Sequence, residues 1–375
     1  MVTSGLSSVL LKGQLAFLRE KGYDVTLIAS PSSELYNYSE IEDVNVYPIE
    51  MTREISIFKD IISLIKIIKY FVKLRPDICN TGTPKAGLLG IIAAYITGVP
   101  VKIYTLRGLR YEGSKGYKKH ILKTVEKLTC QFADVVICIS PSLQDKAVND
   151  GVVAREKTMI IGSGSSNGID VKEYQLTDEV KSNVKALRKE LHIHDTDFII
   201  GFVGRKNKDK GLDELVDSYK ILTKSYSNIK LLIVGPIESD SSISSKTNEY
   251  INLNDNIIEV GFTKNVIPYY YLMDILVLPT YREGFGNVSI EAQATGTPVI
   301  TTNVTGAKDT VKNNVTGLIV PPKNVEELAF AIEKVIQNVD LLDTMGKAAK
   351  KRAIEEFDSQ IIWNGLDELY TKSTN

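Results

Sequence analysis

The sequence has 375 residues but only three cysteines and three histidines, and it lacks any long apolar run. Cys79, Cys130 and Cys138 form no CxxC pair, which argues against a disulfide framework and against a zinc site. No apolar run reaches about 18 residues, so no membrane-spanning helix is predicted. The N-terminus shows no basic segment followed by an apolar one, so no signal peptide is predicted either. We therefore expect a protein of the reducing cytoplasm.

The charges nearly cancel, with a formal net charge of −1. The chain as a whole is therefore not expected to bind nucleic acid or another polyanion, and any such role would need a local patch. The 43% hydrophobic and 24% charged residues are typical of a soluble globular protein. At about 150 residues per domain, the length predicts two domains.

The second half of the chain alternates short apolar runs with amphipathic segments of helical length. The runs are rich in isoleucine, valine and leucine, and glycine, proline or polar residues bound them. Such a pattern is typical of a parallel sheet that helices cover on both faces. The predicted strands are 198–204, 230–235, 274–279 and 297–302, and one predicted helix is 211–225.

The first half repeats the pattern, with strands predicted at 24–29, 101–105 and 134–140 and helices near 7–21, 56–74, 117–132 and 141–149. We therefore predict an α/β protein of two doubly wound Rossmann-like domains. The Gly/Ser-rich stretch 162–175 is the expected boundary, which gives domains of 1–170 and 171–358. No strand follows the last helix, so residues 359–375 could pack on either domain, and we favour the N-terminal one.

The start of the sequence is unusual for such a fold. Only Met1-Val2-Thr3 precedes Ser4-Gly5 and the first predicted helix, where a strand of five or six apolar residues is normal. Two explanations stay open: a first strand truncated because the start site is placed too late, or a strand that is genuinely short.

A glycine-containing loop and a helix follow the predicted strand 274–279. In open α/β sheets, ligands bind beyond the carboxyl ends of strands, where glycines let main-chain amides approach and a helix start favours an anion. Glu283 lies in this loop and Glu291 lies in the helix, so both carboxylates can face one ligand. Carboxylates accept hydrogen bonds from the vicinal hydroxyls of ribose or a sugar. The alternative is a glutamate that stabilises the helix dipole and a second one at the surface.

A basic loop follows the predicted strand 198–204 and precedes the helix near Gly211. Arg205, Lys206, Lys208 and Lys210 crowd it. Cations beside a helix N-terminus suit a diphosphate, and a merely solvated basic loop is the alternative. Since both loops follow strands of one parallel sheet, we expect them to lie on the same sheet edge.

Together, R205-xxxx-K210-G211 and E283-G-F-G-xxxx-E291-A resemble the motifs of glycosyltransferase family 4. The resemblance covers nearly the whole chain. It implies the GT-B fold, two Rossmann-like domains facing across a cleft, and a retaining mechanism. It also implies that Arg205 and Lys210 hold a nucleotide diphosphate, that Glu291 binds the ribose, and that Glu283 lies beside the transferred sugar. Further donor contacts are implied for Gly204, Gly284, Phe285, Gly286, Asn287 and Val288.

The same resemblance implies donor contacts for Ser4 and Gly5, at a helix start, and for the backbone near Phe262, beside the base. Many family members carry a histidine two residues before the proline that corresponds to Pro84. Gly82 stands there in this chain, so what takes the place of that histidine is open. The residues predicted to bind the acceptor are Lys85, Arg107 and Arg110.

Residues 102–127 contain eight Lys or Arg against two Glu. Glycines interrupt this stretch, so we expect a flexible loop that, with Tyr111 and Tyr117, meets a lipid diphosphate head group at a membrane surface. A solvated basic loop is the alternative. The Ile-rich helix 56–74 carries lysines at 59, 66, 69 and 73, and we expect it to face the core rather than to lie on a membrane.

Three other patterns are not assigned a function. Asp195-Thr196-Asp197 has the DxD form of metal sites in the other major glycosyltransferase fold, but it precedes strand 198–204, at the wrong end for the ligand. Residues 162–168 imitate a dinucleotide motif only in part and do not lie within a βαβ unit. The histidines at 120, 192 and 194 form no metal-binding set. We therefore expect neither a metal nor a cofactor.

The predicted function is transfer of a sugar, an N-acetylhexosamine or a hexose, from a UDP-sugar to a polyprenyl-diphosphate-linked saccharide. The family resemblance places this reaction in the synthesis of bacterial capsule, O-antigen or related glycans, at the cytoplasmic face of the inner membrane. Two alternatives stay open. One is an epimerase or phosphorylase of the same fold, and the other is a non-catalytic protein that binds nucleotide sugars.

Overall fold

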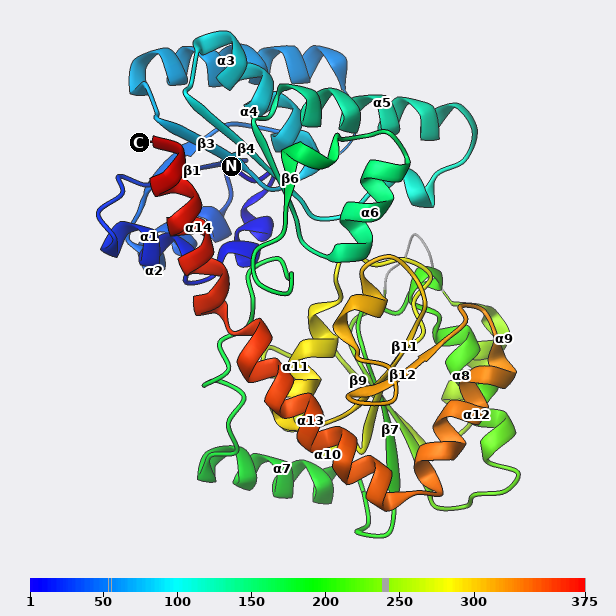
Figure 1. Cartoon of the computed structure of the whole chain (residues 1–375). Coiled ribbons are helices and arrows are strands. Elements are labelled where there is room, and N and C mark those ends of the chain that lie inside the picture. The colour runs from blue at the N-terminus through cyan, green and yellow to red at the C-terminus, as the bar shows by residue number, and fades with distance from the viewer. Residues whose placement is uncertain (53, 55, 238–242, 375) are drawn as a thin grey trace. The chain divides into compact units, whose positions relative to one another are not determined.

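The computed structural model describes residues 1–52, 54, 56–237 and 243–374, and the chain divides into two compact units (Figure 1). Unit 1 comprises Met1–Gly168 together with Ser359–Asn375, and unit 2 comprises Ile169–Asp358. The division falls within the Gly/Ser-rich stretch 162–175, and the last helix belongs to unit 1.

Unit 2 contains a parallel six-stranded sheet of the order β12-β11-β10-β7-β8-β9. The chain enters at β7 in the middle, adds β8 and β9 on one side, and then returns to add β10 on the other side. The switch point of this doubly wound sheet therefore lies between β7 and β10. The strands are β7 (Phe198–Val203), β8 (Ile229–Val234), β9 (Ile257–Gly261), β10 (Ile275–Leu278), β11 (Val299–Thr302) and β12 (Gly317–Val320).

Helices cover both faces of this sheet, as the continuous apolar strands predict. In β7, Ile200 and Phe202 pack toward α8, α9 and α12, whereas Ile199 and Val203 pack toward α7, α10 and α11. The helices are α7 (Asp178–Glu190), α8 (Leu212–Leu222), α9 (Ser245–Asn252), α10 (Ile267–Leu272), α11 (Asn287–Thr295), α12 (Val325–Ile336) and α13 (Val339–Phe357). Figure 1 shows the two layers of helices on either side of the sheet.

Unit 1 is built around the strand pair β1-β2 and the parallel four-stranded sheet β3-β4-β5-β6. The first three residues join them. Val2 N–H donates to the Ile28 carbonyl of β1 (3.0 Å), and Gly82 N–H, just after β3, donates to the Met1 carbonyl (3.0 Å). The strands are β1 (Thr26–Ala29), β2 (Asn45–Pro48), β3 (Ile78–Thr81), β4 (Val101–Leu106), β5 (Val135–Cys138) and β6 (Thr158–Met159).

The helices of unit 1 are α1 (Gln14–Glu20), α2 (Ser33–Glu42), α3 (Ile57–Leu74), α4 (Pro84–Thr97), α5 (Gly116–Phe132), α6 (Pro141–Asn149) and α14 (Ser359–Thr374), with 3-10 turns at η1 (Gly5–Leu11), η2 (Arg110–Gly113) and η3 (Arg155–Lys157). The three cysteines are buried free thiols. Within the described residues, no helix is both long enough and apolar enough to cross a bilayer.

The C-terminal helix α14, drawn in red in Figure 1, packs on unit 1 through an apolar face. Ile362, Leu366 and Tyr370 contact buried residues of β4 and β5. On its flank, the indole Nε1–H of Trp363 donates to Asn167 Oδ1 (2.8 Å). Helix α14 therefore completes the core of unit 1, although 190 residues of unit 2 separate the two segments in sequence.

Two sequence predictions for unit 1 are wrong in detail. The helix expected at 7–21 divides into η1 and α1, because Gly13 takes a left-handed conformation (φ 76°) and its backbone lies against the Trp363 ring. The flexible loop expected within 102–127 is instead η2 followed by the start of α5. Tyr111 is buried and its hydroxyl donates to Asp150 (2.7 Å), so it is not available to a head group.

The packing of α14 gives a stability prediction. Leu366→Ala should lower the free energy of unfolding of unit 1 by about 2–5 kcal/mol, because it leaves a cavity under a buried side chain. Hydrogen exchange should show faster exchange of amides in β3, β4 and β5, with no change in β7 to β12. Lys372→Ala, at an exposed position of the same helix, is the control. Faster exchange confined to unit 2 would contradict this assignment of α14.

Candidate functional site

The switch point of unit 2 brings together the two loops that the sequence motifs singled out. Residues 204–211 follow β7, and residues 279–286 follow β10, its neighbour in the sheet. Because these strands are parallel, both loops emerge at the same edge, where doubly wound folds bind their ligands. The structure therefore places Arg205, Lys210, Glu283 and the start of α11 on one side of one sheet.

Main-chain contacts hold these two loops against each other. The Asp209 carbonyl accepts hydrogen bonds from Tyr281 N–H (2.8 Å) and from the Thr280 hydroxyl (3.0 Å). Gly211 has a left-handed conformation (φ 71°), and a Cβ there would lie 2.0 Å from the Pro279 carbonyl oxygen. Only glycine allows this approach, so the KG pair of the motif has a structural reason.

The ammonium of Lys210 pairs directly with the carboxylate of Glu283. Its Nζ lies 2.9 Å from Oε1 and 2.7 Å from Oε2, and both side chains are less than one-fifth exposed. The pair joins the two motifs side chain to side chain. A second pair lies at the rim of these loops, where Arg282 contacts the Asp209 carboxylate at 2.8 and 2.6 Å.

The other cations of the basic loop have different surroundings. The Arg205 side chain is exposed, next to Gly204 at the end of β7. Lys206 is instead buried, and its ammonium contacts Glu259 of β9 (2.5 Å). The four cations are therefore not equivalent, since Lys206 is buried against a strand of the sheet whereas Arg205 faces solvent.

The start of α11 has the geometry of an anion-binding helix end. Gly286 precedes it in a left-handed conformation (φ 90°), and Asn287 and Val288 form its first turn. A third loop supports this turn, since a Cβ on Gly306 would lie 2.3 Å from the Gly284 carbonyl oxygen. The Phe285 ring is buried against Phe357, so only its main chain can face a ligand.

Glu291 lies in the second turn of α11 and is held by Tyr270. The Tyr270 hydroxyl donates to Glu291 Oε2 (2.7 Å), and Tyr270 itself is fully buried in α10. Burial raises the pKa of Glu291, while the hydrogen bond from Tyr270 lowers it. Tyr270 is not predicted from the sequence, because no short motif connects α10 with α11. On the separate loop that follows β9, the Phe262 ring is exposed.

The predicted donor residues of unit 1 lie where Met1–Thr3 ends. Ser4 precedes η1, and its hydroxyl contacts that of Ser7 (2.9 Å). Gly5 is buried, and a Cβ there would lie 2.1 Å from the Ser32 hydroxyl oxygen. The glycine is thus explained by packing within unit 1, and its donor contact stays a prediction.

Lys85, predicted to bind the acceptor, is engaged within unit 1. Its ammonium contacts both oxygens of Asp60 on α3 (2.6 and 2.5 Å) and the Glu54 carbonyl (2.8 Å). An ammonium has three N–H donors, so these contacts leave none for a ligand. The sequence did not indicate this pair, because 25 residues separate Asp60 from Lys85.

Arg107 lies over Gly82, the position at which the family resemblance led us to expect a histidine. A Cβ on Gly82 would lie only 3.0 Å from Arg107 Nε and 3.2 Å from Nη2. Arg107 Nη1 donates to the Ser166 carbonyl (3.2 Å), while the buried Nε contacts no acceptor among the described residues. Burial lowers the pKa of Arg107 to about 10, so the guanidinium stays charged at neutral pH. Arg110, three residues further along the chain and at the start of η2, is exposed.

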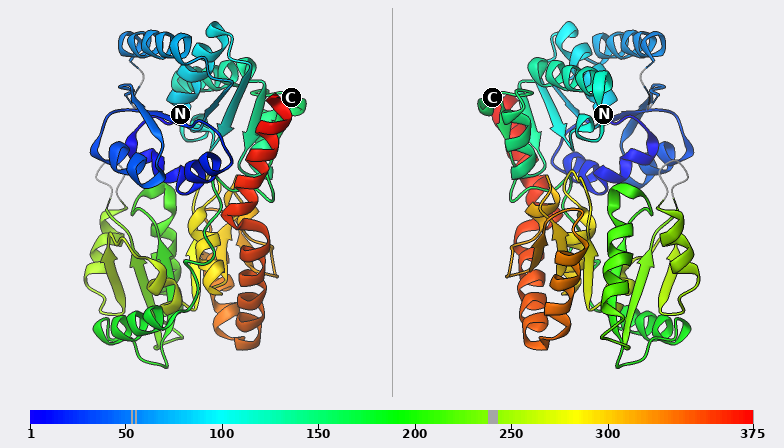
Figure 2. Two further views of the ribbon diagram at one scale, coloured as in Figure 1. Left: turned by 90° about the vertical axis from the view of Figure 1, so that its left-hand side faces the viewer. Right: turned by 90° about the vertical axis from the view of Figure 1, so that its right-hand side faces the viewer.

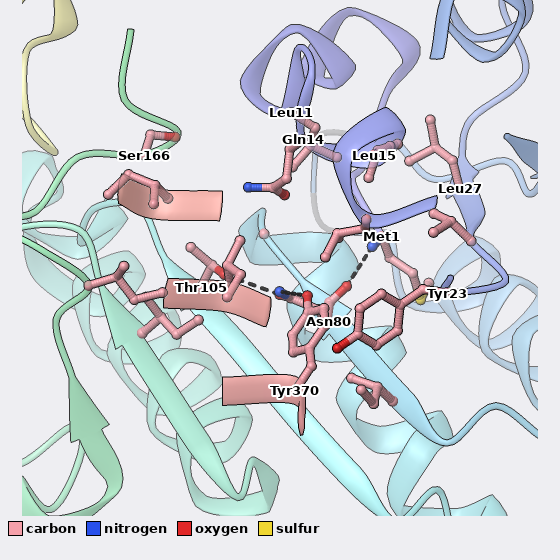
Figure 3. Close-up of a pocket in the computed structure, with 18 of the residues that line it drawn as sticks. Met1, Leu11, Gln14, Leu15, Tyr23, Leu27, Asn80, Thr105, Ser166 and Tyr370 are labelled. Atoms are coloured by element: carbon pink, nitrogen blue, oxygen red, sulfur yellow. Dashed lines mark hydrogen bonds between the residues drawn. The ribbon is translucent and has the colours of Figure 1, made fainter. Parts of the chain in front are cut away.

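A cavity of about 170 Å³ lies beside Met1 in unit 1 (Figure 3). Its walls come from β1, β3, β5 and α14 and are mainly apolar, and Arg107 is the one predicted site residue that borders it. At its polar end, the Met1 ammonium donates to the Asn80 carbonyl (2.6 Å), and Asn80 Nδ2 donates to the Tyr370 hydroxyl (2.7 Å). The cavity therefore lacks the paired charges of the switch point in unit 2.

The DxD sequence, Asp195 to Asp197, forms a turn before β7, at the opposite end of that strand from the basic loop. Asp195 contacts Arg188 (3.2 Å), and Asp197 accepts the His194 amide (2.8 Å). Within the described part of the chain, no cluster of three or more His, Cys, Asp or Glu side chains has the arrangement of a metal site.

Comparisons with known proteins agree with this geometry. Residues 183–352 match the family "Glycosyl transferases group 1", and residues 3–140 match "Glycosyl transferase 4-like". The chain is 44% identical to the capsular polysaccharide biosynthesis glycosyltransferase CapM of Staphylococcus aureus, over 99% of this chain and 95% of CapM. It is 25% identical to the Escherichia coli UDP-Gal:alpha-D-GlcNAc-diphosphoundecaprenol alpha-1,3-galactosyltransferase, over 98% of this chain and 93% of that enzyme.

Among solved structures, Anabaena HepE in complex with UDP and glucose has the same fold, with a TM-score of 0.82 and 20% identity over 99% of this chain and 98% of HepE. The fold, the two family matches and the likeness to CapM all agree with the motifs at the switch point. The chain therefore belongs to glycosyltransferase family 4, and it is a GT-B glycosyltransferase of bacterial surface-polysaccharide synthesis.

Proposed function

We propose that this enzyme transfers an N-acetylhexosamine or a hexose from a UDP-sugar to a lipid-diphosphate-linked saccharide, with retention of configuration. The observation that carries the proposal is the meeting of Arg205, Lys210, Glu283 and the start of α11 at the switch point of unit 2. The name of the E. coli relative gives UDP-Gal as its donor and a diphosphoundecaprenol-linked GlcNAc as its acceptor, which supports the choice of substrates, and so does HepE, which binds UDP.

Arg205 and Lys210 stabilise the diphosphate of the donor as it leaves. Negative charge grows on the departing phosphate in the transition state, and fixed cations in a half-buried site lower its energy more than water does. The bidentate contact with Glu283 holds the Lys210 ammonium in place before the donor arrives. The backbone amides at the start of α11 add donors to the same charge.

The two glutamates bind the two sugars of the donor. Glu291 accepts hydrogen bonds from ribose hydroxyls, and Tyr270 fixes its orientation. Glu283 accepts hydrogen bonds from the hydroxyls of the transferred sugar while it keeps Lys210 beside the diphosphate. The roles of Ser4, Gly5, Arg107 and Arg110 stay predictions from the sequence.

Retention follows a front-face route in this proposal. The acceptor oxygen forms a bond with the anomeric carbon as the bond from that carbon to the diphosphate breaks, and the acceptor proton passes to the departing phosphate oxygen. The protein supplies orientation and charge, and neither a metal nor a cofactor is part of the scheme. Since the acceptor is lipid-linked, the reaction takes place at the cytoplasmic face of the membrane.

If Arg205 and Lys210 hold the diphosphate, substituting either of them should weaken nucleotide binding. Arg205→Ala and Lys210→Ala should each weaken UDP binding by about 10- to 100-fold, because each removes a charge-assisted hydrogen bond. Titration calorimetry with UDP measures this, with thermal shift as a second readout. Lys220→Ala is the matched control, since Lys220 lies on α8 in a surface pair with Asp217. UDP binding that is equal in all four proteins would rule out the assigned roles.

The proposed role of Glu283 predicts that its substitution lowers turnover without weakening UDP binding. Glu283→Gln keeps an acceptor for Lys210 but loses the charge, so it should lower kcat by about 100-fold while UDP affinity stays nearly unchanged. Steady-state transfer assays and UDP titration measure the two quantities. Glu249→Gln, on α9, is the control for a charge change elsewhere in unit 2. Full turnover by Glu283→Gln would show that this carboxylate does not act on the sugar.

The Tyr270–Glu291 pair predicts a shift in pH dependence. UDP binding needs the Glu291 carboxylate, so it should weaken as the pH falls through the pKa of this group. Tyr270→Phe removes a hydrogen bond that lowers the pKa of Glu291, so this pKa should rise. The fall in UDP affinity at acid pH, the acid limb of the profile, should therefore begin at a higher pH. Titrations over a pH series measure the shift, and Tyr269→Phe is the control on the same helix. An unmoved acid limb would contradict the ribose role of Glu291.

A further inference from the structure

Helix α3 of unit 1 has two apolar faces, and only one of them is buried. Ser63, Ile67 and Phe71 pack into the core of unit 1 with residues such as Ile28, Met51 and Leu89. The second face is exposed to solvent, although the isoleucine content of the helix led us to expect a core-facing one. It consists of Ile57 (75% exposed), Phe58 (80%), Ile61 (51%), Ile62 (44%), Ile65 (47%) and Val72 (61%).

These exposed residues form one stripe along the helix. At about 100° per residue, Ile57, Phe58, Ile61, Ile65 and Val72 fall within one 100° arc of the helix circumference. Ile62 lies about 40° beyond this arc, between Lys69 and Lys73. We call these six residues the apolar stripe. Figures 1 and 2 show α3 on the outside of unit 1, packed on one side only.

Lysines occupy the next sector of the same helix. Lys59, Lys66, Lys69 and Lys73 are all exposed, and at the same angular step they follow the apolar stripe around the circumference. The only acidic residue of α3 is Asp60, and it is neutralised by Lys85. The outer surface of the helix thus combines large apolar side chains with uncompensated positive charge.

This combination fits an anionic bilayer better than a protein surface. Helices that lie in a membrane interface carry large apolar residues on one face and lysines on the polar face beside it. The cores of protein interfaces, in contrast, are depleted in lysine. The positive charge adds an attraction of about 1 kcal/mol for each lysine near an anionic surface.

We infer that the apolar stripe of α3 inserts among the acyl chains of an anionic bilayer, with the four lysines at its phosphate groups. Of the membrane contact expected from residues 102–127, only the part at Tyr111 is excluded by burial; the part at the exposed Tyr117 and the basic residues stays a prediction, and α3 is assigned a contact of its own. The inference rests on the proposed function for its purpose, since the acceptor is then presented by the same bilayer, but its test does not depend on activity.

The test is binding of the full chain to vesicles in a flotation assay. The wild type should bind vesicles of phosphatidylglycerol and phosphatidylcholine at low salt, and much less to phosphatidylcholine alone. The triple variant Phe58→Ser, Ile61→Ser and Ile65→Ser should bind at least about tenfold more weakly, because it removes three of the six apolar side chains of the stripe. The variant Lys66→Ala, Lys69→Ala and Lys73→Ala should lose about fivefold for each lysine.

A matched control makes these changes specific. The variant Leu253→Ser, Phe330→Ser and Val339→Ser removes equally exposed apolar residues from unit 2 and should bind vesicles like the wild type. All substituted side chains are exposed, so the thermal unfolding of every variant should match that of the wild type. The inference would be overturned if the wild type did not bind the anionic vesicles, or if the α3 triple variant bound them as well as the control variant did.

Two further measurements separate the competing explanations. If the wild type forms a dimer in sedimentation experiments and the α3 triple variant does not, while both bind vesicles equally, a second copy covers the stripe and the inference fails. Transfer to a water-soluble, short-chain lipid-diphosphate-linked saccharide should be the same for the wild type and the α3 triple variant. A wild type that is inactive in this assay but binds vesicles through α3 would refute the proposed function and leave the membrane inference intact.

Discussion

The contact between the loops after β7 and β10 is the constraint on which the functional site depends. The Asp209 carbonyl, the close approach of Gly211 to Pro279 and the Lys210–Glu283 pair connect two segments that are about 70 residues apart in sequence. The connection exists because β7 and β10 are adjacent parallel strands at the switch point of the sheet. The cation that we propose for the diphosphate and the carboxylate that we propose for the sugar are thereby fixed relative to each other.

Such preorganisation of charges would lower the energy of the transition state in the proposed reaction. A transition state gains most from charges that need no rearrangement when negative charge develops. Gly286 and Gly306 serve the same end, since they bring backbone close to the Glu283–Gly284 turn and leave amides available at the start of α11. The pairing of Lys210 with Glu283 also stabilises two charges that would otherwise be half-buried without a partner.

The sequence predicts the parts of the structure that depend on local patterns. Apolar runs and their spacing predict strands β7, β8, β10 and β11 of unit 2, whereas β12 is not predicted, and the loops at the switch point follow from the positions of their glycines and charges. It does not predict contacts between distant segments. Lys85 finds Asp60 on another helix, Arg107 covers Gly82, and Tyr270 meets Glu291 only because the sheet brings these elements together. For α3, the periodicity predicts an amphipathic helix, but it cannot tell which of two apolar faces the core covers.

The central claim is that the edge of unit 2 holds a nucleotide diphosphate sugar between the cations of one loop and the helix start of the next. A crystal structure of the enzyme with a UDP-sugar tests this most directly. We expect diphosphate oxygens within hydrogen-bonding distance of Arg205, Lys210 and the first amides of α11, the ribose at Glu291, and the transferred sugar at Glu283. A donor bound elsewhere, with the Lys210–Glu283 pair and the α11 amides remote from every phosphate, would contradict the account.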